Sequence, residues 1–411
     1  MDQRSAPPTL QRSPTGGRGP IRPNSRAAPS ARYRDGVPPR VFAYFVLFTV
    51  TALALALHAV SARREQSLGL GRIARVLTTT VATIFVFTLP AKSGRFDLGA
   101  FSVLQMVWLS VAVVAPATGI AVLLQRRAGR AVTRPARVAA RLSLLMIPVA
   151  VYAMGIEPRR LQFETAQAAA RIPLQTPLRI GVLSDIQCSR ITDHERDAVA
   201  RLMSERPDFI VIAGDLFQGT DAHFERAQDD FVALLRGLAA PRGVWVVRGD
   251  VDSDTSRRAY FDQITREAGV RVLVDEAARF EVRGQSVELY GFDRWKQDWA
   301  ALDRFLRSPR EPGFARIVLS HWPDTVLKHR DGMDVDLFIA GHTHGGQVVV
   351  PFFGPPMILS QVPRRIGAGG LHRVNGAQIY VSRGVGMERN HAPRVRFLCP
   401  PEVAVVTLAS P

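Results

Sequence analysis

A glycine-rich turn with two histidines sets the tightest limit on what this chain can be. It reads Gly341-His342-Thr343-His344-Gly345-Gly346-Gln347 and follows the apolar run 335–340, which is typical of a buried strand. Two imidazoles one residue apart at a strand end can each present a ring nitrogen to a metal ion. The glycines let the backbone bend sharply and approach an ion or an oxyanion closely. The pattern therefore predicts a metal-binding turn.

Acidic and imidazole residues upstream repeat this arrangement, each just after an apolar run. Asp185 follows residues 178–184, Asp215 follows 209–213, Asp250 follows 244–248 and His321 follows 316–320. Runs of this length bounded by Gly or Asp fit strands that are covered on both faces. Helical periodicity at Ala198, Leu202 and Met203 predicts a β-α-β unit between the first two carboxylates. Because open α/β sheets hold their sites at the carboxyl ends of strands, we expect these side chains to lie together.

In chain order, the motifs Asp, Gly-Asp, Gly-Asp-x-Asp, His and Gly-His-x-His resemble those of the calcineurin-like metallophosphoesterases. The resemblance covers about residues 175–410. The two-histidine turn and the later Tyr380-Val381-Ser382-Arg383-Gly384 are similar to the membrane-associated bacterial branch of that family. The resemblance implies an α/β fold, a four-layer α/β/β/α sandwich, with a two-metal site that hydrolyses phosphate esters.

The resemblance also implies a role for each motif residue. The expected ligands are Asp185, Gln187, Asp215 and His344 for the first metal, and Asp215, Asp250, His321 and His342 for the second. Asp215, Asp250 and His342 are the expected catalytic positions, and Arg248 or Arg383 could contact phosphate through a guanidinium fork. Two cations about 3.5–4 Å apart lower the pKa of a water and neutralise phosphoryl charge. Carboxylate and imidazole ligands together suit Mn, Fe or Zn.

Three positions depart from the motifs of the family. The family's first motif is Asp-x-His, but its third position here is Gln187. The family's third motif is Gly-Asn-His-Asp or Gly-Asn-His-Glu, and it reads Gly249-Asp250-Val251-Asp252 here. Gln187 offers a weaker and harder ligand than imidazole, whereas Asp250 adds a negative charge to the second site. The two changes alter the balance between the two metal sites.

Val251 stands where the family has its catalytic histidine. An isopropyl group cannot protonate a leaving group, and losing a general acid costs about 10²–10⁴ in rate. The loss matters less for a phosphoanhydride or an aryl ester, whose leaving groups are already good. His194 and His223 are candidates to replace the lost imidazoles, and His391 lies in a loop that often faces phosphate in the branch that the chain resembles. The competing hypothesis is a catalytically silent sandwich that binds metal or a phosphorylated ligand as a scaffold.

The charge distribution argues against nucleic acid as a partner. The net charge is +17, but residues 1–160 hold 22 of the 53 basic residues and 5 of the 36 acidic ones. The rest of the chain carries 31 of each and is neutral overall. A neutral catalytic half has no field to steer a polyanion. We therefore expect a phosphorylated small molecule or lipid as substrate, and membrane lipids as partners.

The N-terminal half has the composition of a membrane region. Four apolar segments, 41–60, 76–91, 101–124 and 142–156, contain His58 as their only Asp, Glu or His. The first and third are long enough to cross a bilayer, whereas the two shorter ones could be interfacial or re-entrant. Ionisable groups deep in a span are the usual mark of transport, so the segments are typical of an anchor. The prediction is a multi-pass protein of the cell membrane.

The arginine counts give conflicting predictions for the orientation of the protein in the membrane. The loops 61–75 and 125–141 carry four and six Arg, and the loop 92–100 has two basic residues. The short-loop rule places the two arginine-rich loops in the cytoplasm, so that the phosphoesterase domain faces outward. The eight Arg of the leader favour the opposite orientation. The side of the membrane stays open at this point.

The sequence divides into four predicted parts. They are a disordered basic leader (1–40), a transmembrane region of about four helices (41–156), a linker (157–177) and the metallophosphoesterase domain (178–411). The leader is rich in Pro, Arg, Ser and Gly and cannot bury enough apolar surface to fold. The linker contains a predicted first strand, and its shortness would hold the active site near lipid headgroups.

Overall fold

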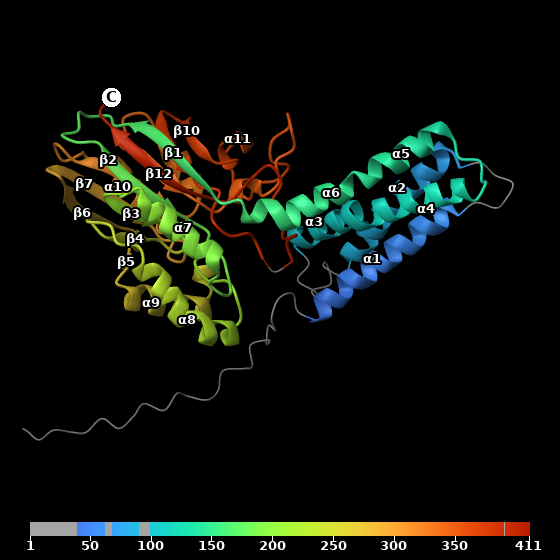
Figure 1. Ribbon diagram of the computed structural model, residues 1–411. Helices are drawn as coiled ribbons and strands as arrows, with labels where there is room; N and C mark the ends of the chain where they lie inside the picture. The colour runs from blue at the N-terminus through green and yellow to red at the C-terminus, as the bar shows by residue number, and fades with distance from the viewer. Residues whose placement is uncertain (1–38, 62–67, 90–98, 390) are drawn as a thin grey trace, which may run out of the picture.

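The computed structural model describes residues 39–61, 68–89, 99–389 and 391–411. The predicted leader falls almost wholly outside the described residues. Figure 1 shows two parts, a sandwich of two sheets and a bundle of apolar helices that extends from one end of it.

The sandwich contains two six-stranded sheets. The first has the order β1 (Gln162–Ala169), β12 (Glu402–Ala409), β2 (Leu178–Leu183), β3 (Phe209–Ile212), β4 (Val244–Val246) and β5 (Arg271–Val272). The second has the order β10 (Gly370–Val374), β11 (Ala377–Val381), β9 (Leu337–Ala340), β8 (Ala315–Ser320), β7 (Gln285–Phe292) and β6 (Glu276–Val282). The run β2 to β5 is parallel, as is the run β11, β9, β8 and β7. The strands that were predicted to carry the motifs are all present.

Helices cover the outer face of each sheet. They are α7 (Asp193–Ser204), α8 (Asp221–Arg236) and α9 (Thr255–Ala268) on the first sheet, with α10 (Trp299–Arg307) and the short α11 (Arg364–Gly367) on the second. Short 3-10 turns at Val251–Ser253, Pro323–Lys328 and His344–Gly346 follow β4, β8 and β9. This confirms the α/β/β/α sandwich and the helix predicted between the first two carboxylates.

The strands alternate their side chains between two cores. In β3, Phe209 and Val211 belong to the core between the sheets, whereas Ile210 and Ile212 face the helices of the first outer layer. All four are buried, as the continuous apolar run predicted. A strand with both faces buried is held in one register, since a slip by one residue would exchange its two faces. The loops at its end are therefore fixed in position.

Among the described residues, four helices are long and apolar enough to cross a membrane, at 41–60, 71–88, 100–127 and 134–159. They comprise α1 (Pro39–Val60), α2 (Leu70–Thr88), the run α3 (Ala100–Leu109), Ser110–Val114 and α4 (Ala115–Arg127), and the run α5 (Arg134–Leu144), α6 (Met146–Val151) and Tyr152–Ile156. The second and fourth are longer than their apolar segments, because arginine is a good helix former and extends them.

Leu68, which follows the first loop of the bundle, pairs with residues of the third loop. The amide of Leu68 donates to the carbonyl of Ala131 at 2.9 Å, and the amide of Thr133 donates to the carbonyl of Leu68 at 2.9 Å. This agrees with two arginine-rich loops on one side and the catalytic domain on the other. The side that each faces stays a prediction.

The helical bundle joins the sandwich through direct contacts. The carboxylate of Glu157, which ends the last helix, is buried and accepts from the amides of Leu398 and Cys399 at 2.7 and 2.6 Å. The amide of Arg396 donates to the carbonyl of Ala153 at 2.9 Å. The predicted first strand is β1, which pairs in parallel with β12 at the sheet edge. The four-part division stays a prediction, with β1 counted in the sandwich.

Candidate metal centre

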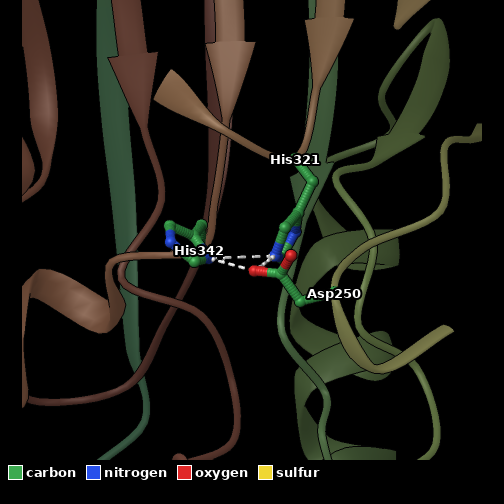
Figure 2. Close-up of side chains that lie close together, drawn as sticks. All are labelled: Asp250, His321 and His342. Carbon is green, nitrogen blue, oxygen red and sulfur yellow. Dashed lines mark hydrogen bonds and ion pairs between the residues drawn. The ribbon is translucent and has the colours of Figure 1, made fainter. Parts of the chain in front are cut away.

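Six predicted ligands gather where the two sheets meet. Asp185, Asp215 and Asp250 follow β2, β3 and β4 of the first sheet, and His321, His342 and His344 follow β8 and β9 of the second. Ligand atoms of Asp250, His321 and His342 all lie within 4.8 Å of one another, as do those of Asp185, Asp215 and His321. Figure 2 shows the first of these groups, in which the side chains point toward one another. The strand-end rule therefore predicted the position of the cluster.

The backbone at the cluster adopts a rare conformation. Asp185, Gln187, Asp215, His342 and His344 have positive φ angles of 49°, 39°, 59°, 73° and 48°. Positive φ is uncommon outside glycine and tends to concentrate at functional sites, where the surrounding structure enforces it. The amide of His342 donates to Oδ2 of Asp185 at 3.1 Å, which ties two of these turns together. The sequence analysis attributed the bend to glycines, but the histidines and aspartates bend as well.

Two glycines are needed for close approach. A Cβ on Gly249 would lie 2.0 Å from Oδ1 of Asp215, and one on Gly341 would lie 1.9 Å from Oγ of Ser184. Neither distance is possible for a real side chain, so both positions require glycine. The two glycines let the loops after β4 and β9 pack against the loops after β3 and β2.

We call Asp250, His321 and His342 the second half of the centre. Nδ1 of His342 lies 2.8 Å from Oδ2 of Asp250 and 3.2 Å from Nε2 of His321. Nδ1 of His321 donates to the carbonyl of Ala213 at 2.7 Å, and Nε2 of His342 donates to the carbonyl of Leu359 at 2.7 Å. Because a carbonyl only accepts, these bonds fix the proton on the outer nitrogen of each ring. The inner nitrogens are then the ring atoms that could bind a metal ion.

We call Asp185, Gln187 and His344 the first half, with Asp215 shared between the halves. His344 is buried, and neither of its ring nitrogens has a hydrogen-bond partner among the described residues. The carbonyl oxygen of Gln187 is likewise buried and unpartnered there, while its amide donates to Oδ2 of Asp215 at 3.1 Å. Unpaired buried polar atoms are costly and call for an explanation such as an ion. The donor set therefore fits a divalent cation.

Burial and charge set the protonation of the cluster. Burial lowers the pKa of His344 to about 4, which keeps the imidazole in the neutral form that binds metals. Burial raises the pKa of Asp215 well above its ordinary value, against the opposing charge of His321. Burial also acts to raise the pKa of Asp250, but the neighbouring imidazoles of His321 and His342 outweigh it and hold that pKa well below its ordinary value. Asp250 therefore stays ionised.

Asp252 is a site residue to which the sequence analysis gave no role. Its carboxylate accepts from the amides of Asp215, Leu216 and Gly249 at 2.6, 3.0 and 2.9 Å. These bonds fix the turn after β3 on the turn after β4. Asp252 therefore positions the shared ligand, and the motif Gly-Asp-x-Asp contained the signal.

Arg294 is a second residue that the sequence analysis missed. Its Nε pairs with Oδ1 of Asp250, and its guanidinium lies 3.8 Å from the centre of the Trp322 ring. The indole of Trp322 also donates to Oδ2 of Asp250, at 3.1 Å. Arg294 follows β7 by two residues, so the strand-end rule could have found it. It places a positive charge beside the second half of the centre.

The two predicted phosphate contacts are engaged elsewhere. The guanidinium of Arg248 donates to Asp293 at 3.0 Å and to Asp262 at 2.5 Å. The guanidinium of Arg383 donates to Glu164 at 2.6 Å. The structure does not bring either guanidinium together with the histidines. Both guanidinium groups are therefore held by carboxylates away from the clustered histidines.

The three other candidate histidines lie outside the centre. A ring nitrogen of His194 bonds the carbonyl of Val385 at 3.0 Å, His223 accepts from the amide of Thr220 at 3.2 Å, and His391 bonds Ser102 of α3 at 3.0 Å. Val251 is itself buried, and its amide donates to Oδ1 of Asp215 at 2.9 Å. Among the described residues, none of these three histidines joins the metal-ligand groups.

Comparison with known proteins identifies the family to which the chain belongs. Residues 178–346 match the model of the family described as calcineurin-like phosphoesterase. The uncharacterized metallophosphoesterase YkuE of Bacillus subtilis is 30% identical over 224 residues, which cover 52% of this chain and 72% of that protein. Phosphodiesterase YaeI of Escherichia coli is 30% identical over 239 residues, which cover 56% of this chain and 82% of that protein.

A third relative matches over a shorter stretch. UDP-2,3-diacylglucosamine pyrophosphatase LpxG of Chlamydia trachomatis is 31% identical over 108 residues, which cover 24% of this chain and 30% of that protein. The two longer matches span most of their relatives, and residues 178–346, which match the family model, include the turns that carry the six clustered side chains. The chain accordingly belongs to the calcineurin-like metallophosphoesterases, a family of metal-dependent phosphoester hydrolases.

Proposed function

We propose that this protein is a membrane-anchored phosphoesterase that hydrolyses a phosphate ester or a pyrophosphate, with a lipid-linked molecule as its substrate. The observation that carries the proposal is the meeting of five carboxylate and imidazole side chains at the strand ends, beside buried atoms of His344 and Gln187 that lack a partner among the described residues. Asp185, Gln187, Asp215 and His344 would hold one divalent ion, and Asp215, Asp250, His321 and His342 the other. Mn, Fe or Zn suits this set.

When bound, the two cations would supply a water of lowered pKa and would neutralise charge on the phosphoryl oxygens. The chain's own residues orient and support the site. The carbonyls of Ala213 and Leu359 fix the tautomers of His321 and His342. Asp252 holds the turn of Asp215 in place. Arg294, beside Asp250, would contact a phosphoryl oxygen in place of the two arginines that are engaged elsewhere.

Val251 restricts the substrate to molecules that need no acid. No proton can come from its isopropyl group, so the leaving group must depart as a stable anion. A phosphoanhydride or an ester of an acidic alcohol meets this condition. The same residue favours a second candidate function, a sandwich that binds metal and a phosphorylated ligand without turnover.

The membrane region supports the lipid-linked character of the substrate. Four helices are apolar enough to span a bilayer, and Glu157 joins the last of them rigidly to the sandwich. LpxG, a UDP-2,3-diacylglucosamine pyrophosphatase by name, is consistent with a phosphoanhydride on a lipid as substrate. We propose a multi-pass anchor with the catalytic domain on the outer side, as the arginines at the far end of the bundle indicate.

The test is to purify the full chain in nanodiscs, measure bound metal, and assay aryl phosphate mono- and diesters with added Mn. Two ions per chain, with turnover that is lost in His344→Ala, would support the enzyme. Metal that stays bound without turnover on any of these esters would favour the binding module. If His342→Ala changed neither metal content nor turnover, the assignment of the centre would be wrong.

A further inference from the structure

A cavity of about 280 Å³ lies between the membrane region and the metal centre. One wall is helix α3 with the turn that follows it, and the opposite wall is formed by the loops after β9 and β11. His342 and His344 line it, together with Gln347 and Glu388. The cavity thus connects two proposed metal ligands to a helix that is apolar enough to cross a bilayer.

The wall that α3 contributes is one continuous apolar face. Phe101, Leu104, Trp108 and Val111 line the cavity at intervals of three, four and three residues, which places them on one side of the helix. The opposite side carries Met106, which is fully buried in the core that α3 shares with α1. The helix therefore packs with one face and leaves the other to the cavity.

The loop wall is apolar as well and is tied to the metal centre. Residues 356–359, Pro-Met-Ile-Leu, line the cavity, and the carbonyl of Leu359 accepts from the ring of His342. Met357 and Leu359 expose 36% and 46% of their surface. Only the end of the cavity at the histidines is polar.

A neighbouring cavity provides a contrast. It is lined by α1 residues such as Phe42 and Val46, and it shares Trp108 and Ala392 with the first. No member of the metal centre lines it. Both cavities are apolar, but of the two only the first is also lined by residues of the metal centre.

We propose that the first cavity receives the hydrocarbon chain of a phosphorylated lipid whose phosphate lies at the metal centre. Membrane helix α3 then forms part of the substrate site, and the lipid enters from the bilayer. The inference rests on the proposed phosphoesterase function and adds the place where the hydrocarbon chain of its substrate binds. A water-soluble phosphate ester would leave the α3 face in contact with water, whereas a chain in the cavity covers it.

The first test compares two soluble diesters on the full chain in nanodiscs, 4-nitrophenyl butyl phosphate and 4-nitrophenyl dodecyl phosphate. They differ only in eight methylenes, and each methylene that becomes buried contributes up to about fourfold in binding. We expect kcat/KM for the dodecyl ester to exceed that for the butyl ester by at least about tenfold. Leu104→Trp fills the cavity and should bring the ratio close to one. The control Val113→Trp, at an exposed position outside both cavities, should keep the wild-type ratio.

The second test measures the binding of a lipid analogue that cannot be hydrolysed. A dodecyl phosphonate with a terminal diazirine is photolysed with the full chain in nanodiscs, and the labelled residues are mapped by mass spectrometry. We expect labels on α3 and on residues 356–359, with unlabelled dodecyl phosphonate as competitor. The exposed face of α2, at Leu77, Val81 and Phe85, is the internal control for general contact with lipid.

The outcomes separate the cavity from the activity. Competed labelling of α3 above the level of α2 supports the cavity, and it would do so even if neither ester were hydrolysed, a result that would overturn the proposed activity alone. Equal labelling of α3 and α2, or equal kcat/KM for the two esters, would overturn the cavity and leave the phosphoesterase standing.

Discussion

The two halves of the metal centre differ in how well their side chains satisfy one another. In the second half, Asp250 and the two histidines are joined by contacts of 2.8 and 3.2 Å, and Arg294 adds a positive charge. In the first half, His344 and the carbonyl of Gln187 keep buried polar atoms without partners among the described residues. A cation would compete with Arg294 in the second half and with no protein cation in the first.

This difference bears on the two departures from the family motifs, Gln187 in the first half and Asp250 in the second. Gln187 weakens the donor set of a half that is already free to receive an ion, whereas Asp250 adds charge to a half where an arginine competes. A carboxylate is a stronger ligand for a hard cation than the amide it replaces. We therefore expect both halves to bind metal, with the first half the weaker of the two. The predictions below test that asymmetry, beginning with the residue that both halves share.

Asp215→Asn should abolish the centre in both halves at once. Loss of a residue that merely orients a ligand costs about 10- to 100-fold, so loss of a shared ligand should lower kcat/KM by more than about 10³-fold. Metal analysis should show that both ions are lost. The matched control is Asp303→Asn, an exposed carboxylate on α10 that pairs with Arg307. A variant that kept one ion at full occupancy would show that the halves are independent.

Val251→His tests the missing acid at the edge of the second half. If the imidazole is placed as the family resemblance implies, turnover of an alkyl phosphate should rise by about 10²-fold, because a general acid contributes most when the leaving group is poor. Turnover of a nitrophenyl ester should change little. Val251→Ala removes the isopropyl group without supplying an acid and is the control. Equal gains on both esters would contradict a role in protonation.

The sequence predicted the strands and the clustering of the side chains that follow them, because each of these residues follows an apolar run whose two buried faces fix its register. The positions of Asp185 and His321 could be predicted in this way, and their roles as metal ligands stay a prediction. Asp252 and Arg294 also lie at strand ends, but their contacts could not be predicted. Their roles depend on which loops meet, and residues 215 and 252 are brought together only when β3 and β4 pair.

The arginines show the same limit from the other side. Arg248 has the right residue type at the right strand end, but its guanidinium is held by Asp262 and Asp293, which come from α9 and the end of β7. The position in the sequence predicts where the Cα atom of a long side chain lies, but it does not predict where the charged group at its tip lies. A short side chain such as Asp185 has little freedom, so its position is the better prediction.

Gln187→His tests the weaker half directly. An imidazole is a stronger ligand than an amide for Mn, Fe or Zn, so the affinity for the more weakly held ion should increase by about tenfold. The measurement is metal content against increasing chelator, where the wild type should lose its ions in two steps that move closer together in the variant. Gln218→His, at another buried glutamine close by, is the control and should leave the two steps unchanged.

Arg294→Gln should have the smallest effect of these variants, and it should change both substrate binding and metal binding. Loss of a charged hydrogen bond to phosphate should raise KM by about tenfold with little change in kcat. The same change removes the cation that competes at Asp250, so the second half should hold its ion more tightly and the two steps of the chelator titration should move further apart. Arg258→Gln, which removes a guanidinium stacked on Trp295, is the matched control and should change neither property. If KM rose while the metal steps stayed in place, Arg294 would serve phosphate alone, and the asymmetry between the halves would have to come from their ligands.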